Sequence, residues 1–200
     1  MLEATELECE RGGRTLFRSL SFALAAGDLL RIAGPNGSGK TSLLRILCGL
    51  LTPSHGEVRW NRSPIRELRE DYSRSLLYLG HAPAVKDDLT PLENLDVACR
   101  VVGVVAHKEA LSWALSAFAV PDLPVRKLSQ GQRRRAALAR LLMSESVPLW
   151  LLDEPFAALD TGAAEYTEEL IGRHLAAGGS VVYTTHQPAG IDSSARVVQL

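Results

Sequence analysis

The sequence has no apolar run that approaches the roughly 18 to 20 residues needed to span a bilayer. Its longest candidate, 97–106, is short and contains Arg100. Residues 1–6 lack the basic region and apolar core of a secretory signal, so we expect no such signal. If the protein serves a membrane, we expect it to act through a membrane-embedded partner.

Cysteine and net charge are also scarce. The three cysteines are far apart in the chain, so the sequence predicts neither a disulfide framework nor a zinc site, and it fits a reducing cytoplasm. The formal net charge of −1 gives no electrostatic reason to expect nucleic-acid binding. Hydrophobic residues make up 46% of the chain, which is enough for the core of one compact domain.

Strands and helices are predicted to alternate along the chain. Short apolar runs indicate strands, whereas apolar residues at helical spacing follow Lys40 and Ser129. This alternation predicts an α/β fold with a largely parallel sheet. A mostly helical stretch from about Pro91 to Val120 interrupts it and predicts a separate lobe. The expected strands are 29–33, 57–60, 76–79, 149–152, 180–185 and 196–200.

A glycine-rich segment, 34–41, has the spacing of a phosphate-binding loop and lies between an expected strand and an expected helix. Its glycines let backbone N–H groups curl around phosphate oxygens, and the helix start adds its positive dipole end. Lys40 is expected to reach the β- and γ-phosphates, and Thr41 to offer its hydroxyl to Mg²⁺. The predicted nucleotide-binding residues here are Gly34, Pro35, Asn36, Gly37, Ser38, Gly39, Lys40, Thr41 and Ser42.

Two acids, Asp153 and Glu154, follow the apolar run 149–152, at the edge where α/β sheets bind ligands. Asp153 is predicted to hold Mg²⁺ through its water shell, and Glu154 to polarise an attacking water. His186 follows a later expected strand, and we expect it to contact the γ-phosphate or to orient that water. The predicted catalytic residues are Glu154 and His186, and the predicted metal ligands are Thr41 and Asp153.

A short segment, 128–132, points to one kind of nucleotide enzyme. Its sequence, Leu-Ser-Gln-Gly-Gln, resembles the signature of the ATP-binding cassette (ABC) ATPases, usually Leu-Ser-Gly-Gly-Gln. Ser129 has the chemistry of a helix N-cap, and a helix start presents free N–H groups to an anion. In that family the anion is the γ-phosphate of ATP bound to the other subunit. The resemblance implies that Ser129, Gly131 and Gln132 close the ATP site of a second copy, in a homodimer with ATP at its interface.

The remaining motifs follow in the order typical of the family, and the resemblance covers essentially the whole chain. Residues 156–160 resemble the D-loop, and His186 matches the switch histidine. The resemblance implies ATP hydrolysis and a P-loop ABC ATPase fold with a mostly parallel sheet, a small antiparallel β portion and a helical lobe. We expect one ATP-binding domain, 1–200, with a core of about 1–75 and 145–200 and a helical lobe of about 85–144.

Two features that are usual in the family are missing. A glutamine that touches Mg²⁺ or water usually follows the strand predicted at 76–79, but His81 and Ala82 stand there. The aromatic residue that usually stacks on adenine is also absent, which leaves Arg11 or Phe17 to cover the base. Selectivity for ATP over GTP therefore rests on the resemblance alone.

Several short stretches resemble one subgroup, the ATP-binding subunits of the bacterial cytochrome c maturation system, which are called heme exporters. This resemblance implies a peripheral protein on the cytoplasmic face of the bacterial inner membrane. It also implies an integral membrane permease and other cytochrome c maturation factors as partners, although the chain has no heme-attachment motif of its own. The stretches are 14–17, 56–60, 78–81 and 184–188.

Other functions remain open at this stage. The chain could serve a transporter of another small substrate, or be an ABC ATPase that acts on DNA or ribosomes, although such proteins generally carry two cassettes or a long coiled-coil insertion. A small-molecule kinase would leave segment 128–132 without a role. Three consecutive arginines, 133–135, fit a solvated helix face better than a nucleic-acid site, and we expect no nucleic-acid partner.

Overall fold

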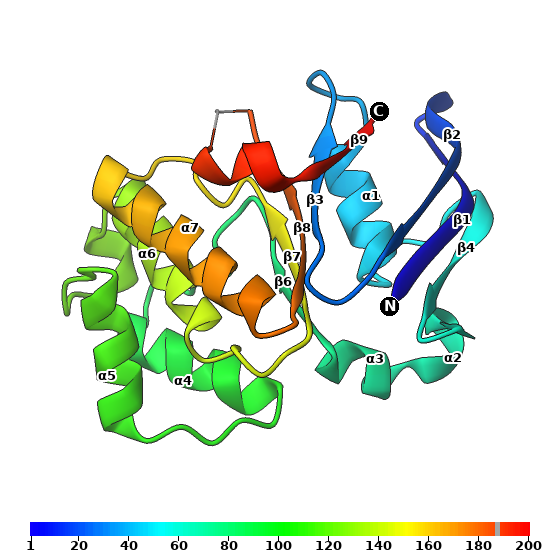
Figure 1. The fold of residues 1–200 in the computed structure, drawn as a ribbon. Coiled ribbons are helices and arrows are strands. Elements are labelled where there is room, and N and C mark those ends of the chain that lie inside the picture. The colour runs from blue at the N-terminus through cyan, green and yellow to red at the C-terminus, as the bar shows by residue number, and fades with distance from the viewer. Residues whose placement is uncertain (187–188) are drawn as a thin grey trace.

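The computed structural model describes residues 1–186 and 189–200, in two sheets with helices between and beside them (Figure 1). Gln187 and Pro188, which belong to the stretch 184–188 noted above, lie outside the described residues. Among the residues that are described, no helix is both long enough and apolar enough to cross a membrane.

The larger sheet has five strands, and all of its neighbouring strands are parallel (Figure 1). In order across the sheet these strands are β6 (Leu76–Leu79), β7 (Leu149–Asp153), β8 (Ser180–Thr184), β3 (Leu29–Ala33) and β9 (Arg196–Gln199). β7 and β8 are buried along their whole length, which explains their unbroken apolar sequences. The predicted α/β fold with a largely parallel sheet is confirmed.

A smaller antiparallel sheet supplies the expected antiparallel portion. Its strands, in order, are β2 (Arg14–Leu24), β1 (Leu2–Arg11), β4 (His55–Trp60) and β5 (Ser63–Pro64). The pairing of β1 with β2 is interrupted by register shifts on either side of Leu7. These irregularities break the two-residue alternation of buried side chains, so the sequence pattern predicts no strand before residue 29.

Helix α1 (Lys40–Leu47) lies between the two sheets (Figure 1). Its fully buried Leu43 and Leu44 belong to a core cluster that also contains Leu151 of the parallel sheet and Leu7 of the antiparallel one. Because α1 is fixed on both sides, the loop that precedes it is held at the carboxyl end of β3.

The other face of the parallel sheet is covered by helices (Figure 1). These are α4 (Pro91–Val101), α5 (Lys108–Ala117), α6 (Gln130–Leu138) and α7 (Thr161–Ala176). Trp150 and Tyr183 are fully buried in this second core cluster. The short elements are α2 (Ile65–Leu68), α3 (Glu70–Arg74) and the 3₁₀ turns η1 (Val125–Lys127), η2 (Ala139–Leu141) and η3 (Gly190–Ser194).

Candidate functional site

A cavity of about 380 Å³ opens at the carboxyl edge of the parallel sheet. It gathers residues from the loop before α1, from the ends of β7 and β8, and from the turn after β6. The lining residues are Leu16, Asn36, Gly37, Gly39, Lys40, Thr41, Ser42, His81, Asp153, Glu154 and His186. Most of the residues predicted for nucleotide, metal and catalysis therefore meet in one place.

The glycine-rich loop adopts a backbone conformation that would be strained in a residue with a side chain. Gly39 has φ +103°, and a Cβ there would lie 3.0 Å from the Cβ of Leu16. Lys40 is 7% exposed, and its Nζ donates to the carbonyls of Gly34 (2.8 Å) and Pro35 (3.0 Å). The ammonium group is thus held beneath the loop by the loop's own carbonyls, as a buried charge requires.

One hydroxyl at this loop is unsatisfied. Ser38 Oγ is buried and has no hydrogen-bond partner among the described residues. Together with the buried Lys40 ammonium, this free donor gives the loop a chemistry that suits an anionic oxygen ligand.

A chain of hydrogen bonds connects the loop to the two acids. Thr41 Oγ1 donates to Asp153 Oδ2 (2.8 Å), and Thr184 Oγ1 donates to Asp153 Oδ1 (2.7 Å). The same Thr184 hydroxyl accepts the backbone N–H of Glu154 (3.0 Å). Both oxygens of the Asp153 carboxylate are therefore fixed, and the peptide of Glu154 is held from β8.

Glu154 adopts a strained backbone conformation. Its φ of +53° is uncommon for a residue with a side chain and costs of order 1–3 kcal/mol. One carboxylate oxygen accepts the backbone N–H of His186 (3.0 Å), and the other lies 3.3 Å from His186 Nε2. That second oxygen is buried without a hydrogen-bond partner of good geometry within the described part of the chain. It remains available to a polar group in the cavity.

The oxygen donors fit a magnesium ion. Mg²⁺ prefers oxygen ligands and usually takes one or two carboxylates together with substrate phosphates and waters. Thr41 and Asp153 supply a hydroxyl and a carboxylate, already 2.8 Å apart. No group of three or more His, Cys, Asp or Glu side chains suited to a metal occurs in the described ranges, 1–186 and 189–200. The residues present thus fit an ion that is shared with a bound phosphate.

The signature segment does not line this cavity. Ser129 caps α6 as predicted: its Oγ accepts the N–H of Gln132 (3.2 Å), and Gln132 Oε1 accepts the N–H of Ser129 (2.9 Å). A Cβ on Gly131 would lie 2.6 Å from the carbonyl oxygen of Ala158, so α6 packs directly on the loop after β7. Within one chain, Ser129, Gly131 and Gln132 are not brought together with the phosphate loop.

The expectation that the three arginines form a solvated face is wrong for Arg134. This side chain is 3% exposed and points inward, where its guanidinium donates to backbone carbonyls of the turns after β6 and β7. Arg133 and Arg135 instead make ion pairs with Asp87 (2.7 Å) and Asp160 (3.7 Å). Charge alone could not distinguish the three arginines, because the position around the helix determines which of them points inward.

Neither residue considered for the nucleotide base lines the cavity. Phe17 is buried in the core cluster around α1, and Arg11 is exposed at the end of β1. Leu16 lines the cavity instead. Leu16 could not be predicted from the sequence, because an apolar side chain by itself carries no functional signal.

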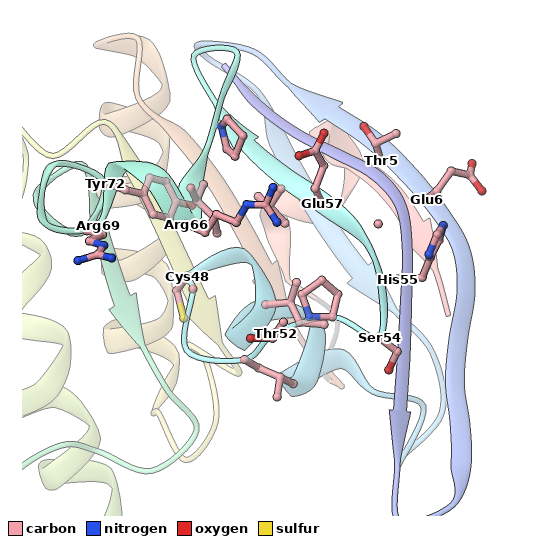
Figure 2. Close-up of a pocket in the computed structure, with 18 of the residues that line it drawn as sticks. Thr5, Glu6, Cys48, Thr52, Ser54, His55, Glu57, Arg66, Arg69 and Tyr72 are labelled. Carbon is pink, nitrogen blue, oxygen red and sulfur yellow. The ribbon is translucent and has the colours of Figure 1, made fainter.

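A second, larger cavity of about 960 Å³ lies at the other end of α1, between β4 and the α2–α3 segment. Figure 2 shows Cys48 at the end of α1, Thr52 from the loop that follows, Glu57 from β4, and Arg66 and Tyr72 from α2 and α3. None of the residues predicted for nucleotide binding or catalysis lines it. It is separate from the site described above.

The comparisons with known proteins agree with this geometry. A family model described as "ABC transporter" matches residues 17–157. The "Cytochrome c biogenesis ATP-binding export protein CcmA" of Aromatoleum aromaticum is 55% identical over 192 residues, covering 94% of this chain and 90% of that protein. The protein of the same name from Escherichia coli K12 is 47% identical over 195 residues, covering 97% and 93%.

A solved structure, a dimeric ATP-binding cassette in a post-hydrolysis state bound to ADP and phosphate, superposes with a TM-score of 0.84. It covers 100% of this chain and 94% of that one at 23% identity. At that identity the likeness concerns the fold.

Proposed function

The chain belongs to the ABC transporter family of ATP-hydrolysing subunits, and from this premise we propose that it powers an export complex for cytochrome c biogenesis. The support for the specific pathway is the identity of 47–55% to cytochrome c biogenesis ATP-binding export proteins, over nearly the whole of both chains. ATP is the substrate, and its hydrolysis to ADP and phosphate is the reaction.

One structural observation carries the proposal. The hydrogen-bonded series from Thr41 through Asp153 and Thr184 to Glu154 links the phosphate loop to a strained acid inside one cavity. A phosphate-binding loop alone would serve any nucleotide protein. A loop joined in this way to a carboxylate with a free oxygen is suited to hydrolysis.

We propose the following roles within this cavity. Lys40 and the N–H groups of 34–39 hold the β- and γ-phosphates, and Ser42 lies beside them on α1. Thr41 and Asp153 would hold Mg²⁺, which neutralises charge on the phosphate oxygens when it is bound. Glu154 orients the attacking water through its free oxygen, and His186 fixes the carboxylate from the other side.

We further propose that the working unit is a homodimer. Ser129, Gly131 and Gln132 lie outside the cavity of their own chain, and the positive dipole end at the start of α6 suits an anion. In the proposed dimer these residues contact the γ-phosphate bound to the other copy. The proposal retains the division into a core of about 1–75 and 145–200 and a helical lobe of about 85–144, which would bring α6 to the partner's nucleotide.

The proposed membrane partner is an integral permease, at the cytoplasmic face of the bacterial inner membrane, together with further cytochrome c maturation factors. The export function named for the relatives supports a partner that crosses the membrane. Affinity purification of the chain from detergent-solubilised membranes tests this. We expect a permease and maturation factors to come with it. A permease of another pathway would discard the cytochrome c connection, and no membrane protein at all would contradict the transport function.

A further inference from the structure

Arg134 is a buried cation that is paired with backbone carbonyls. Nη2 donates to the carbonyls of Asp153 and Glu154, both at 2.7 Å. Nη1 donates to the carbonyl of Gly80 at 2.9 Å and, more weakly, to that of His81 at 3.4 Å. Burial lowers the pKa of Arg134, against the opposing effect of the nearby Asp153 and Glu154 carboxylates. So costly a placement needs the fork of donors that only a guanidinium provides.

The four carbonyls belong to two separate turns of the site. Asp153 ends β7 and Glu154 follows it, and these two residues carry the proposed metal-binding and catalytic carboxylates. Gly80 and His81 follow β6, and His81 lines the same cavity. Arg134 itself stands on α6, one turn after the capping Ser129. The Arg134 side chain therefore connects α6 to both turns at the nucleotide cavity.

The contact with Glu154 matters most because the backbone of Glu154 is strained. Its N–H is held by Thr184 (3.0 Å), and its carbonyl accepts from Arg134 (2.7 Å) and from the N–H of Ala157 (3.1 Å). A residue with φ +53° persists only where its surroundings fix it from several sides. The direction of the Glu154 side chain follows from this backbone conformation.

We propose that Arg134 is a positioning residue for ATP hydrolysis, which fixes the Glu154 peptide and connects it rigidly to α6, the helix that Ser129 caps. Movement of α6 toward a partner's nucleotide then changes the placement of Glu154 in its own site. This inference rests on the proposed role of Glu154. It goes beyond that role by assigning a residue that touches neither the nucleotide cavity nor the solvent.

Two substitutions test the proposal in the full chain, purified with its membrane partner. Arg134→Gln removes the charge and the fork, and we expect kcat for ATP to fall about 10- to 100-fold, since a displacement of about 1 Å has effects of that order. The KM for ATP is expected to change less than about 3-fold, because the phosphate loop is untouched. Arg134→Lys keeps the charge but not the fork of donors. If Arg134→Gln does not fold, the expected loss of kcat is measured in Arg134→Lys instead.

A double variant distinguishes the loss of a positioning contact from general damage to the fold. In Glu154→Gln, where the carboxylate is already lost, adding Arg134→Lys is expected to change the single-turnover rate less than about 2-fold. A further loss as large as in the wild-type background would overturn the proposal. Wild-type kcat in a folded Arg134 variant would overturn it as well.

Arg133→Gln is the matched control, because Arg133 precedes Arg134 on the same helix and pairs with Asp87 outside the cavity. We expect its kcat and KM to match those of the wild type, and an equal loss of kcat in this variant would count against a specific role for Arg134. Equal hydrolysis by the wild type and Glu154→Gln would remove the proposed role of Glu154, on which this inference rests, whereas no hydrolysis by the wild-type complex would contradict the proposed function itself. Normal hydrolysis by the wild type with unaffected Arg134 variants would remove only this inference.

Discussion

Thr184 shows how single side chains hold the site together. Its hydroxyl donates to Asp153 and accepts from the N–H of Glu154, so it uses both capacities of the group. The residue is fully buried at the end of β8, where no water can replace either contact. The neighbouring strand β8 thus fixes the Asp153 carboxylate at the end of β7 and the peptide of Glu154 that follows it.

Thr184→Val is expected to destabilise the protein by about 1–3 kcal/mol, since it leaves buried polar groups unpaired with little change of shape. It should also lower kcat, because Glu154 loses the partner of its N–H. Urea unfolding and steady-state ATPase measurements check both effects. Thr167→Val is the control: this buried hydroxyl donates only to the carbonyl of Ala163 within α7, so kcat should not change. Equal kcat in the two variants contradicts the assigned role of Thr184.

Among elements, α6 packs closely on the loop that follows β7. Gly131 sits where a Cβ would meet the carbonyl of Ala158 at 2.6 Å, and backbone cannot yield as a flexible side chain does. α7 is held differently, since the ring of His174 stacks on Trp150 with centroids 3.8 Å apart. We therefore expect a glycine-to-alanine substitution to have opposite effects on stability in α6 and in α7.

Gly131→Ala is expected to push α6 away from the loop after β7 and to lower both stability and kcat, with a cost of about 1–3 kcal/mol from overpacking. Gly172→Ala, on α7, has no atom within 4 Å of the added Cβ. It is expected to stabilise the protein by about 0.5–1 kcal/mol without affecting kcat, because alanine favours the helix. Thermal unfolding distinguishes the pair, and a stable, active Gly131→Ala would refute the close packing.

The stability of α7 is expected to depend on pH through His174. Burial lowers the pKa of this residue below the 6.5 of a free histidine, with the backbone of Glu145 and Ser180 acting in the opposite direction. As pH falls below that value, the unfolded chain binds a proton that the folded chain does not, so the free energy of unfolding decreases. His174→Phe keeps a ring against Trp150 but cannot titrate. Urea unfolding at about pH 7.5 and 5.5 should show a larger decrease for the wild type than for the variant; equal decreases exclude His174 as the cause.

The elements that could be predicted from the sequence are those with an uninterrupted apolar run or a clear helix cap. β3 and β6 lie where their apolar runs predicted them, and α6 begins after its predicted cap. β1 could not be predicted in the same way, because its register shifts spoil the alternation of buried residues. The inward orientation of Arg134 could not be predicted either, since it depends on backbone carbonyls from turns that lie far apart in the sequence.

For the whole molecule, each chain has half of what the proposed reaction needs. The phosphate loop and the acids face one cavity, while Ser129 and Gly131 lie outside it. Two copies placed head to tail would complete two sites at once, with ATP as the ligand that favours the closed state. The solved cassette with the same fold is itself described as dimeric, in a post-hydrolysis state with ADP and phosphate.

The most direct test of this account is the oligomeric state of Glu154→Gln, measured by sedimentation with ATP, with ADP and without nucleotide. We predict a dimer with ATP alone, since slow hydrolysis leaves the bridging ligand in place, and a return to monomer when Lys40→Ala or Ser129→Arg is added. A variant that binds ATP and remains monomeric would contradict the claim that two copies of this chain share the nucleotide.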